Sequence, residues 1–79
     1  MNPISSWLHQ FLGKGEALPE GIDEENFFAA GILDSFDAIL LVEAIEAEYG
    51  FRFSEKHFQD PRFVTIAGLT DIIEELGRN

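Results

Sequence analysis

The sequence predicts an all-α fold, a small four-helix bundle with three main helices plus a short third helix. Three observations support this prediction. Apolar residues recur at helical spacing in three separate segments, capping residues or glycine bound each segment, and the one alternating stretch, FRF at 51–53, is too short for a sheet. A chain of 79 residues has the size of a single domain, so we expect residues 1–79 to fold together.

The first predicted helix begins at Pro3, because proline suits a first helical turn, where its missing N–H costs nothing. Apolar residues at helical spacing then continue as far as Gly13: Ile4, Trp7, Leu8 and Phe11. The next segment, GKGEALPEGIDEEN, contains three glycines and a proline and predicts a long loop, with Leu18 and Ile22 as apolar anchors. We expect the following residues, 27–33, to form a loop with packed side chains.

Residues 35–49 have the clearest helical signal, and Gly50 ends it. One arc of this segment is apolar and is expected to face the core: Ala38, Leu41, Val42, Ile45 and Tyr49. Ser54 is predicted to cap one or two helical turns before Pro61.

Thr65 is predicted to cap a last helix that Gly77 ends. Its apolar stripe consists of Ile66, Leu69, Ile72, Ile73 and Leu76.

The charge and composition exclude several classes of protein. The formal net charge is −10, with 15 acidic and 5 basic residues, so nucleic-acid binding is not expected. The acidic surface either steers basic partners toward the protein or serves solubility alone. Without cysteine there is no disulfide, thiol nucleophile or thiolate metal site. Because the N-terminus lacks a secretory signal and no apolar run could span a bilayer, we expect a cytoplasmic protein that does not insert into membranes.

Two acceptor side chains stand at the start of the 35–49 helix. Asp34 and Ser35 could both accept hydrogen bonds from free backbone N–H groups of a first turn. Alternatively Ser35 is an attachment point, because a helix N-terminus favours a phosphate esterified there. The carboxylates of Asp34 and Asp37 would then direct the modified side chain outward.

The opposite face of this helix predicts a partner-docking strip. Phe36, Leu40 and Ala47 project away from the core arc, and charged residues border them: Asp37, Glu43, Glu46 and Glu48. An apolar centre with a charged rim is the usual layout of a protein-binding surface. In the alternative, the long loop folds over the strip and covers it.

No catalytic or metal-binding pattern is visible. His9 and His57 lack an obvious acid partner or nucleophile, so both are expected at the surface or the boundary of the core. Trp7 and the phenylalanines other than Phe36 are expected to belong to the core and not to a ligand cage. The run Asp23, Glu24, Glu25 lacks the spacing of a calcium loop. The sequence therefore predicts no enzyme and no metal site.

The segment FFAAGILDSFDAILLVEAIEAEYGFRF resembles the core of an acyl carrier protein or of a related peptidyl, aminoacyl or D-alanyl carrier domain. The resemblance rests on Gly31, Asp34, Ser35, Phe36, Ala44, Ile45, Glu46, Glu48 and Tyr49, and it extends more weakly from Pro3 to Leu76. It implies that a phosphopantetheinyl transferase esterifies Ser35 with 4′-phosphopantetheine from coenzyme A. The thiol of that arm would carry an acyl or aminoacyl group as a thioester, which agrees with the absence of cysteine.

The resemblance also implies partners with basic docking surfaces: a loading ligase and a downstream transferase or synthase. Three residues depart from the pattern usual in fatty-acid carriers, namely Phe36 for Leu, Leu40 for Glu and Glu43 for Met. These departures favour a specialised lipid, polyketide, peptide or cell-envelope pathway over general fatty acid biosynthesis. We also expect the protein to be a monomeric, stand-alone carrier. The short first helix predicts a small or absent acyl cavity. The alternative function is an unmodified acidic helical adaptor that binds a basic partner.

Overall fold

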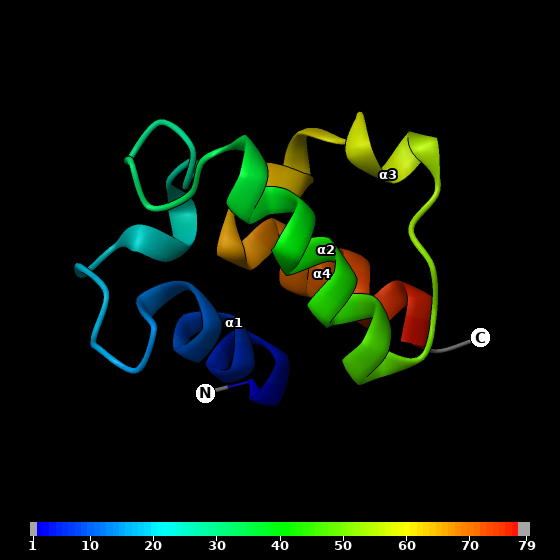
Figure 1. Ribbon diagram of the computed structural model, residues 1–79, viewed down its shortest axis with the longest axis horizontal. Coiled ribbons are helices and arrows are strands. Elements are labelled where there is room, and N and C mark those ends of the chain that lie inside the picture. The colour runs from blue at the N-terminus through cyan, green and yellow to red at the C-terminus, as the bar shows by residue number, and fades with distance from the viewer. Residues whose placement is uncertain (1, 78–79) are drawn as a thin grey trace.

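Four α-helices and two 3₁₀ turns follow one another along residues 2–77, the part of the chain that the computed structural model describes (Figure 1). Their order is α1 (Pro3–Gly13), η1 (Ile22–Glu24), α2 (Ser35–Tyr49), α3 (Glu55–Phe58), η2 (Pro61–Val64) and α4 (Ile66–Gly77). No strand occurs within residues 2–77. The predicted all-α bundle with a short third helix is confirmed.

The helix ends follow local capping chemistry. The Asn2 side chain accepts a hydrogen bond from the Ile4 N–H at 2.8 Å, and Pro3 occupies the first turn of α1. The predicted end at Gly13 is confirmed, although Lys14 rather than a glycine adopts the left-handed conformation there, with φ of 52°. At the end of α2 a glycine does take that conformation, since Gly50 has φ of 74°.

The predicted caps of α3 and α4 are also present. The Thr65 hydroxyl accepts from the Gly68 N–H at 2.9 Å, which satisfies a free donor in the first turn of α4. Ser54 precedes α3 as its N-cap residue, and its N–H donates to Nδ1 of His57 at 2.9 Å. Pro61 does more than follow this short helix, because it opens the 3₁₀ turn η2.

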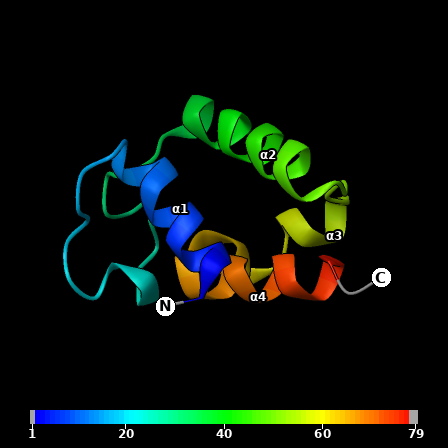
Figure 2. The same cartoon turned by 90° about the horizontal axis from the view of Figure 1, so that it is seen from below.

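The helices form two layers around one core. Figure 2 shows α2 along one side of the molecule and α4 along the opposite side, with α1 toward one end and α3 toward the other. The α4 helix packs against η2, α1 and η1. Side chains from every part of the bundle except α3 form the buried core: Leu8, Leu12, Ile22, Phe27, Leu33, Leu41, Ile45, Phe53, Phe63, Ile66, Leu69, Ile72 and Ile73.

The η2 turn lies directly against α4. A Cβ atom added to Gly68 would lie 2.3 Å from the Arg62 carbonyl oxygen, so only glycine permits this approach. The Arg62 guanidinium donates to Asp60 at 2.9 Å and to Glu75 at 2.7 Å. Together these contacts fix the segment that leads into α4.

The long loop between α1 and α2 is anchored beside the bundle. Ile22 is buried as predicted, and Leu18 is half-buried. The Phe27 N–H donates to the Val64 carbonyl oxygen at 2.9 Å, which ties the loop to η2. Since these contacts hold the loop beside η2 and α4, it does not cover the outer face of α2 (Figure 1).

Within residues 2–77 no helix has the length and apolar character needed to cross a membrane.

Candidate functional site

Ser35 is the first residue of α2, and its side chain is exposed to solvent. Asp34 is the N-cap residue, because its Oδ1 accepts from the Asp37 N–H at 2.8 Å. The Ser35 hydroxyl makes no hydrogen bond within the described residues. Of the two roles that the sequence leaves open for this serine, capping is therefore performed by Asp34, and the serine oxygen is free.

At the start of α2 the backbone attracts an anion, whereas the neighbouring side-chain charges repel one. The first-turn N–H groups of Ser35 and Phe36 have no acceptor within the helix, and they favour an anion close to the helix axis. The carboxylates of Asp34 and Asp37 disfavour one. An anionic ester on Ser35 is therefore best placed projecting away from the helix, where this exposed side chain already lies.

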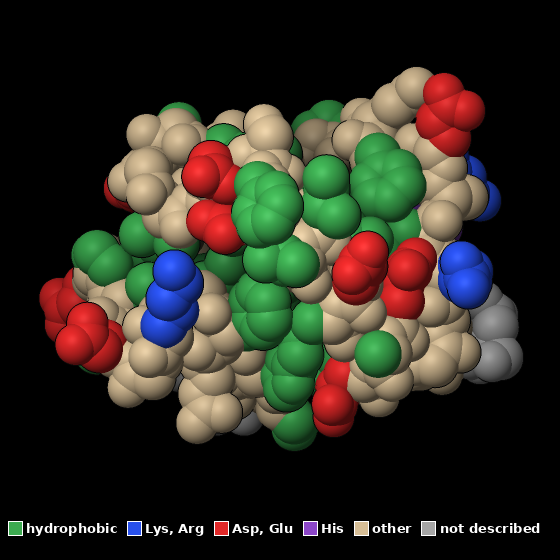
Figure 3. Space-filling view, viewed as in Figure 1, with side chains coloured by type: hydrophobic (Ala, Val, Ile, Leu, Met, Phe, Trp, Pro, Cys, Tyr) green, Lys and Arg blue, Asp and Glu red, His purple; other side chains and the backbone are tan. Residues whose placement is uncertain are grey.

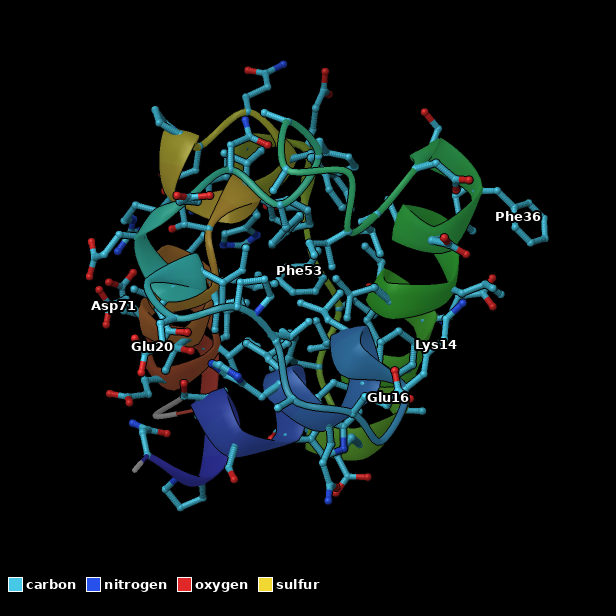
Figure 4. All side chains as sticks on the ribbon, turned by 90° about the vertical axis from the view of Figure 1, so that its left-hand side faces the viewer. Lys14, Glu16, Glu20, Phe36, Phe53 and Asp71 are labelled. Carbon is cyan, nitrogen blue, oxygen red and sulfur yellow. The ribbon has the colours of Figure 1, made fainter. Side chains whose placement is uncertain are left out.

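Large apolar side chains stand exposed around this serine. Phe36 is 69% exposed, Ile39 60% and Leu40 44%. Figure 4 shows Phe36 pointing away from the molecule at the start of α2. In Figure 3 a band of hydrophobic side chains crosses this face over α2 and α1 and continues toward α3. The alternative in which the long loop folds over this face and covers it is therefore wrong.

The apolar surface crosses α2 instead of running along it as the sequence suggests. Ile39 and Leu40 follow Phe36 by three and four residues and flank it on the helix surface. Ala47 is exposed but lies on the order of 16 Å further along the axis, at 1.5 Å rise per residue. It lines a separate hollow with Glu43, Glu46, Gly50, Phe51 and Arg52. We define the docking face as Phe36, Ile39 and Leu40 of α2 together with Phe58 of α3.

Two members of the docking face were missed by the sequence reasoning. Ile39 could have been found, because it follows Phe36 at the helical spacing of three residues. Phe58 was expected in the core with the other phenylalanines, but it is 48% exposed. Its ring packs against the rings of Phe53 and Phe63 at centroid distances of 5.9 and 5.4 Å, so only one side of it is buried. No sequence signal places that ring beside α2.

A groove of about 340 Å³ lies between α2 and α3 within the docking face. Its lining is apolar except for one carboxylate: Ala38, Ile39, Val42, Glu43, Phe58 and Phe63. A second pocket of about 250 Å³ lies on the other flank of α2, against the end of α1. The beginning of α2 therefore has an apolar hollow on each side.

The predicted acidic rim is only partly free. Glu43 and Glu48 are exposed, and Asp37 is half-buried. Glu46 instead has a structural contact, because its Oε2 accepts from the Phe53 N–H at 2.9 Å and so holds the α2–α3 loop. Burial, and then the charge of the adjacent Glu48, raise the pKa of Tyr49 above its ordinary value. Tyr49 itself packs edge-on against Trp7 of α1 at 5.8 Å between ring centroids.

Both histidines make contacts that stabilise the fold. The expectation that His9 lacks an acid partner is wrong, because its Nε2 lies 2.5 Å from Oδ1 of Asp23 and joins α1 to η1. His57 is half-buried and accepts the Ser54 N–H described above. Within residues 2–77 no group of three or more potential metal-ligating side chains gathers in one place.

A family model described as "Phosphopantetheine attachment site" matches residues 7–73 of the chain. The match includes most of α1, all of α2 and α3, and most of α4. No curated protein and no solved structure gave a match to the chain. An exposed, unbonded serine hydroxyl at the start of an acidic helix fits the covalent attachment that the family description states.

Proposed function

Since the chain belongs to the phosphopantetheine attachment site family, the domain of acyl carrier proteins, we propose that Ser35 is the residue that bears 4′-phosphopantetheine. The protein is accordingly a carrier with a covalent prosthetic group, and domains of this family are not themselves enzymes. When bound, the group supplies a thiol that holds an acyl or aminoacyl group as a thioester. The observation that supports Ser35 is its exposed hydroxyl, which makes no hydrogen bond within residues 2–77.

The attachment step requires an outside enzyme. The Ser35 oxygen forms a bond to the phosphorus next to pantetheine, the anhydride bond of coenzyme A breaks, and adenosine 3′,5′-bisphosphate leaves with the bonding electrons. The hydroxyl proton goes to a base on the phosphopantetheinyl transferase. Asp34 keeps the first turn of α2 in place by accepting the Asp37 N–H, and so it positions the serine without touching the reaction.

The docking face and its acidic border would select the partners. Tethering matters because it converts the diffusion of a free thioester into delivery at high effective concentration. The partners are the transferase, a loading ligase and a downstream transferase or synthase, each with basic groups around an apolar contact. The carboxylates that border the face are Asp37 and Glu43, whereas Glu46, Ala47 and Glu48 lie further along α2 toward its C-terminal end.

Two features favour a specialised pathway over general fatty acid biosynthesis. Leu40 replaces a charge with an apolar side chain in the docking face, where it is 44% exposed. Phe36 places an aromatic ring next to the attachment point. Enzymes that recognise a more acidic and less apolar helix would bind this surface poorly, because uncovered apolar area and unmatched charges both disfavour the complex.

Intact-mass measurement tests the attachment. The protein is incubated with coenzyme A and a broad-specificity phosphopantetheinyl transferase, beside Ser35→Ala. We expect the mass of one phosphopantetheine to appear on the wild type and none on the variant. A wild type that stays unmodified would instead favour the adaptor, and modification of Ser35→Ala would move the site to another residue.

Charge reversal tests the docking proposal. Glu43→Lys changes an exposed carboxylate beside the docking face, whereas Asp71→Lys changes an exposed carboxylate on the opposite side of the molecule from Phe36 (Figure 4). We expect Glu43→Lys to slow modification by the transferase several-fold at low salt and Asp71→Lys to leave it nearly unchanged. Equal slowing by both would show that net charge alone matters.

A further inference from the structure

The ring of His57 closes the start of α3 as a hydrogen-bond acceptor. Its Nδ1 accepts the Ser54 N–H at 2.9 Å and lies 3.0 Å from the Ser54 hydroxyl oxygen. Because a backbone N–H can only donate, Nδ1 carries no proton, and the proton of the neutral ring is on Nε2. The His57 N–H in turn donates to the Ser54 carbonyl oxygen at 3.0 Å. The two residues therefore cap α3 in the manner of a capping box.

The acceptor in this cap is one whose charge can change. The usual side chain at this position of a capping box is glutamate or glutamine. An imidazole, in contrast, is the side chain that ordinarily changes charge between pH 5 and 8. A protonated imidazole has an N–H on both nitrogens and accepts no hydrogen bond. Protonation of His57 would therefore break the bond from the Ser54 N–H.

Little else holds α3 in place. It lies at the edge of the bundle (Figure 1), and none of its residues is buried. The loop before it is fixed at two successive residues, because the Phe53 N–H donates to Glu46 of α2 at 2.9 Å and the next N–H donates to His57. Loss of the second bond leaves the α2 side of this loop anchored. The effect of protonation should therefore be confined to α3, which carries Phe58 of the docking face.

The charges around the ring act in both directions. Glu55 of α3 and Asp60, which lies within electrostatic range of the ring, favour the protonated form. Lys56 of α3 and the Arg62 guanidinium, which donates to Asp60 at 2.9 Å, disfavour it. The Glu46 carboxylate of α2 is occupied by its bond to the loop. Within residues 2–77 no carboxylate forms a hydrogen bond with this ring, so the protonated form gains no partner for the one that it loses.

The other histidine of the chain is bonded in the opposite sense. Nε2 of His9 lies 2.5 Å from Oδ1 of Asp23, and a carboxylate only accepts, so the His9 ring is the donor. Protonation of His9 keeps this bond and adds the attraction of opposite charges. Acid should therefore preserve the contact between α1 and η1 while it removes the cap of α3.

We propose that His57 is a pH-sensitive cap, whose protonation releases α3 and moves Phe58 out of the docking face. The cap is present when the ring is neutral and is lost as the pH falls through the titration of the ring. Without Phe58 the α2–α3 groove loses one of its walls. The release of α3 concerns the chain alone, whereas its effect on docking rests on the proposed function.

NMR spectra of the protein test the cap. At about pH 7.5 the ¹⁵N shifts of the His57 ring should show an unprotonated Nδ1, and the helical Cα shifts of residues 55–58 should decline as the ring titrates toward about pH 5.5. A protonated Nδ1 at neutral pH, or helical shifts that persist after the ring has titrated, would overturn the proposal.

Matched variants assign the transition to one ring. His57→Gln provides an acceptor that does not titrate, so its α3 should keep its helical shifts over the whole range. His57→Glu provides the other usual acceptor should His57→Gln fail to fold. His9→Gln removes the second imidazole and should leave the transition of α3 in place. The same transition in His57→Gln as in wild type would overturn the role of His57.

Rates of phosphopantetheine addition test the effect on docking. The pH dependence of the transferase itself cancels in the ratio of the wild-type rate to that of His57→Gln. We expect this ratio to be near one at neutral pH and to fall about fivefold in mild acid, the effect of losing one cap. A constant ratio beside the NMR transition would overturn the docking effect and leave the cap standing. If neither protein is modified, the proposed function fails, and the NMR result alone decides on the cap.

Discussion

Helices α2 and α4 are both rich in apolar residues, yet they direct them differently. Six residues of α4 are buried, on a face that packs against α1 and the two 3₁₀ turns: Ile66, Gly68, Leu69, Thr70, Ile72 and Ile73. Only Leu41 and Ile45 of α2 are buried, while three large apolar side chains on its other face stand in solvent. A helix that is apolar on one face stabilises the fold, and one that is apolar on both has surface left for binding.

Their charged residues differ in the same way. In the described part of the chain, Glu75 of α4 pairs with Arg62 and Glu74 accepts from Asn2. The carboxylates of Asp37, Glu43 and Glu48 on α2 make no such contact. Glu74 and Glu75 of α4 therefore hold the fold together, whereas these three carboxylates of α2 are available to a partner.

The largest effect should come from truncating matched leucines. Leu69 of α4 is fully buried, so Leu69→Ala should lower the free energy of unfolding by about 2–5 kcal/mol. Leu40→Ala on α2 should lower it by less than about 1 kcal/mol, because much of its side chain is already in water. Urea denaturation of both variants measures the difference. Similar losses would show that the outer face of α2 belongs to the core.

Glycine substitutions within α4 provide the next comparison. Gly68→Ala would bring a methyl group against the Arg62 backbone and should lower the free energy of unfolding by about 2 kcal/mol. Gly77→Ala meets no atom within 4 Å and should be neutral or slightly stabilising, because alanine favours helix more than glycine. Thermal unfolding of the two variants tests this. If Gly68→Ala leaves the free energy of unfolding unchanged, the close packing of η2 against α4 does not contribute to stability.

Removing the N-cap side chain of α2 or of α4 should lower the stability by the same amount, but only removal of the α2 cap should affect the attachment reaction. Asp34→Ala and Thr65→Ala each remove one side-chain acceptor and should each lower the free energy of unfolding by about 1 kcal/mol. Only Asp34→Ala should also slow the addition of phosphopantetheine, because only α2 presents the serine. Denaturation and intact-mass time courses separate the two effects. Equal slowing in Thr65→Ala would assign the loss to general stability.

The smallest effect concerns acid pH. Hydrogen bonds from Arg62 lower the pKa of Asp60 below its ordinary value. A depressed folded-state pKa stabilises the fold above the unfolded value of about 3.9, and this stabilisation is lost as the pH falls through the folded value. Asp60→Asn should therefore reduce the stability difference between neutral pH and pH 3. Urea denaturation of the wild type and of Asp60→Asn at neutral pH and at pH 3 measures this difference. If Asp60→Asn loses as much stability at pH 3 as the wild type does, Asp60 does not contribute to the loss of stability in acid.

Local sequence features predicted the helices well. Pro3, Gly50 and Thr65 mark helix ends because their effects are contained within one turn of backbone. The exposure of Phe36 and Leu40 followed from their position opposite the core arc of α2.

Contacts between distant segments could not be predicted in this way. The pairing of His9 with Asp23 and the bond from the Phe53 N–H to Glu46 depend on how the loops fold back. Phe58 belongs to the docking face only because α3 lies beside α2, and Ala47 is separated from that face by its distance along the helix.

By itself the sequence determined the all-α class, the helix ends and the acidic, serine-led helix, because periodicity and capping act between residues a few positions apart. The tertiary structure alone decided which apolar side chains are covered, since coverage depends on where α1, α3 and the long loop lie against α2. The same arrangement creates the two hollows that flank the start of α2.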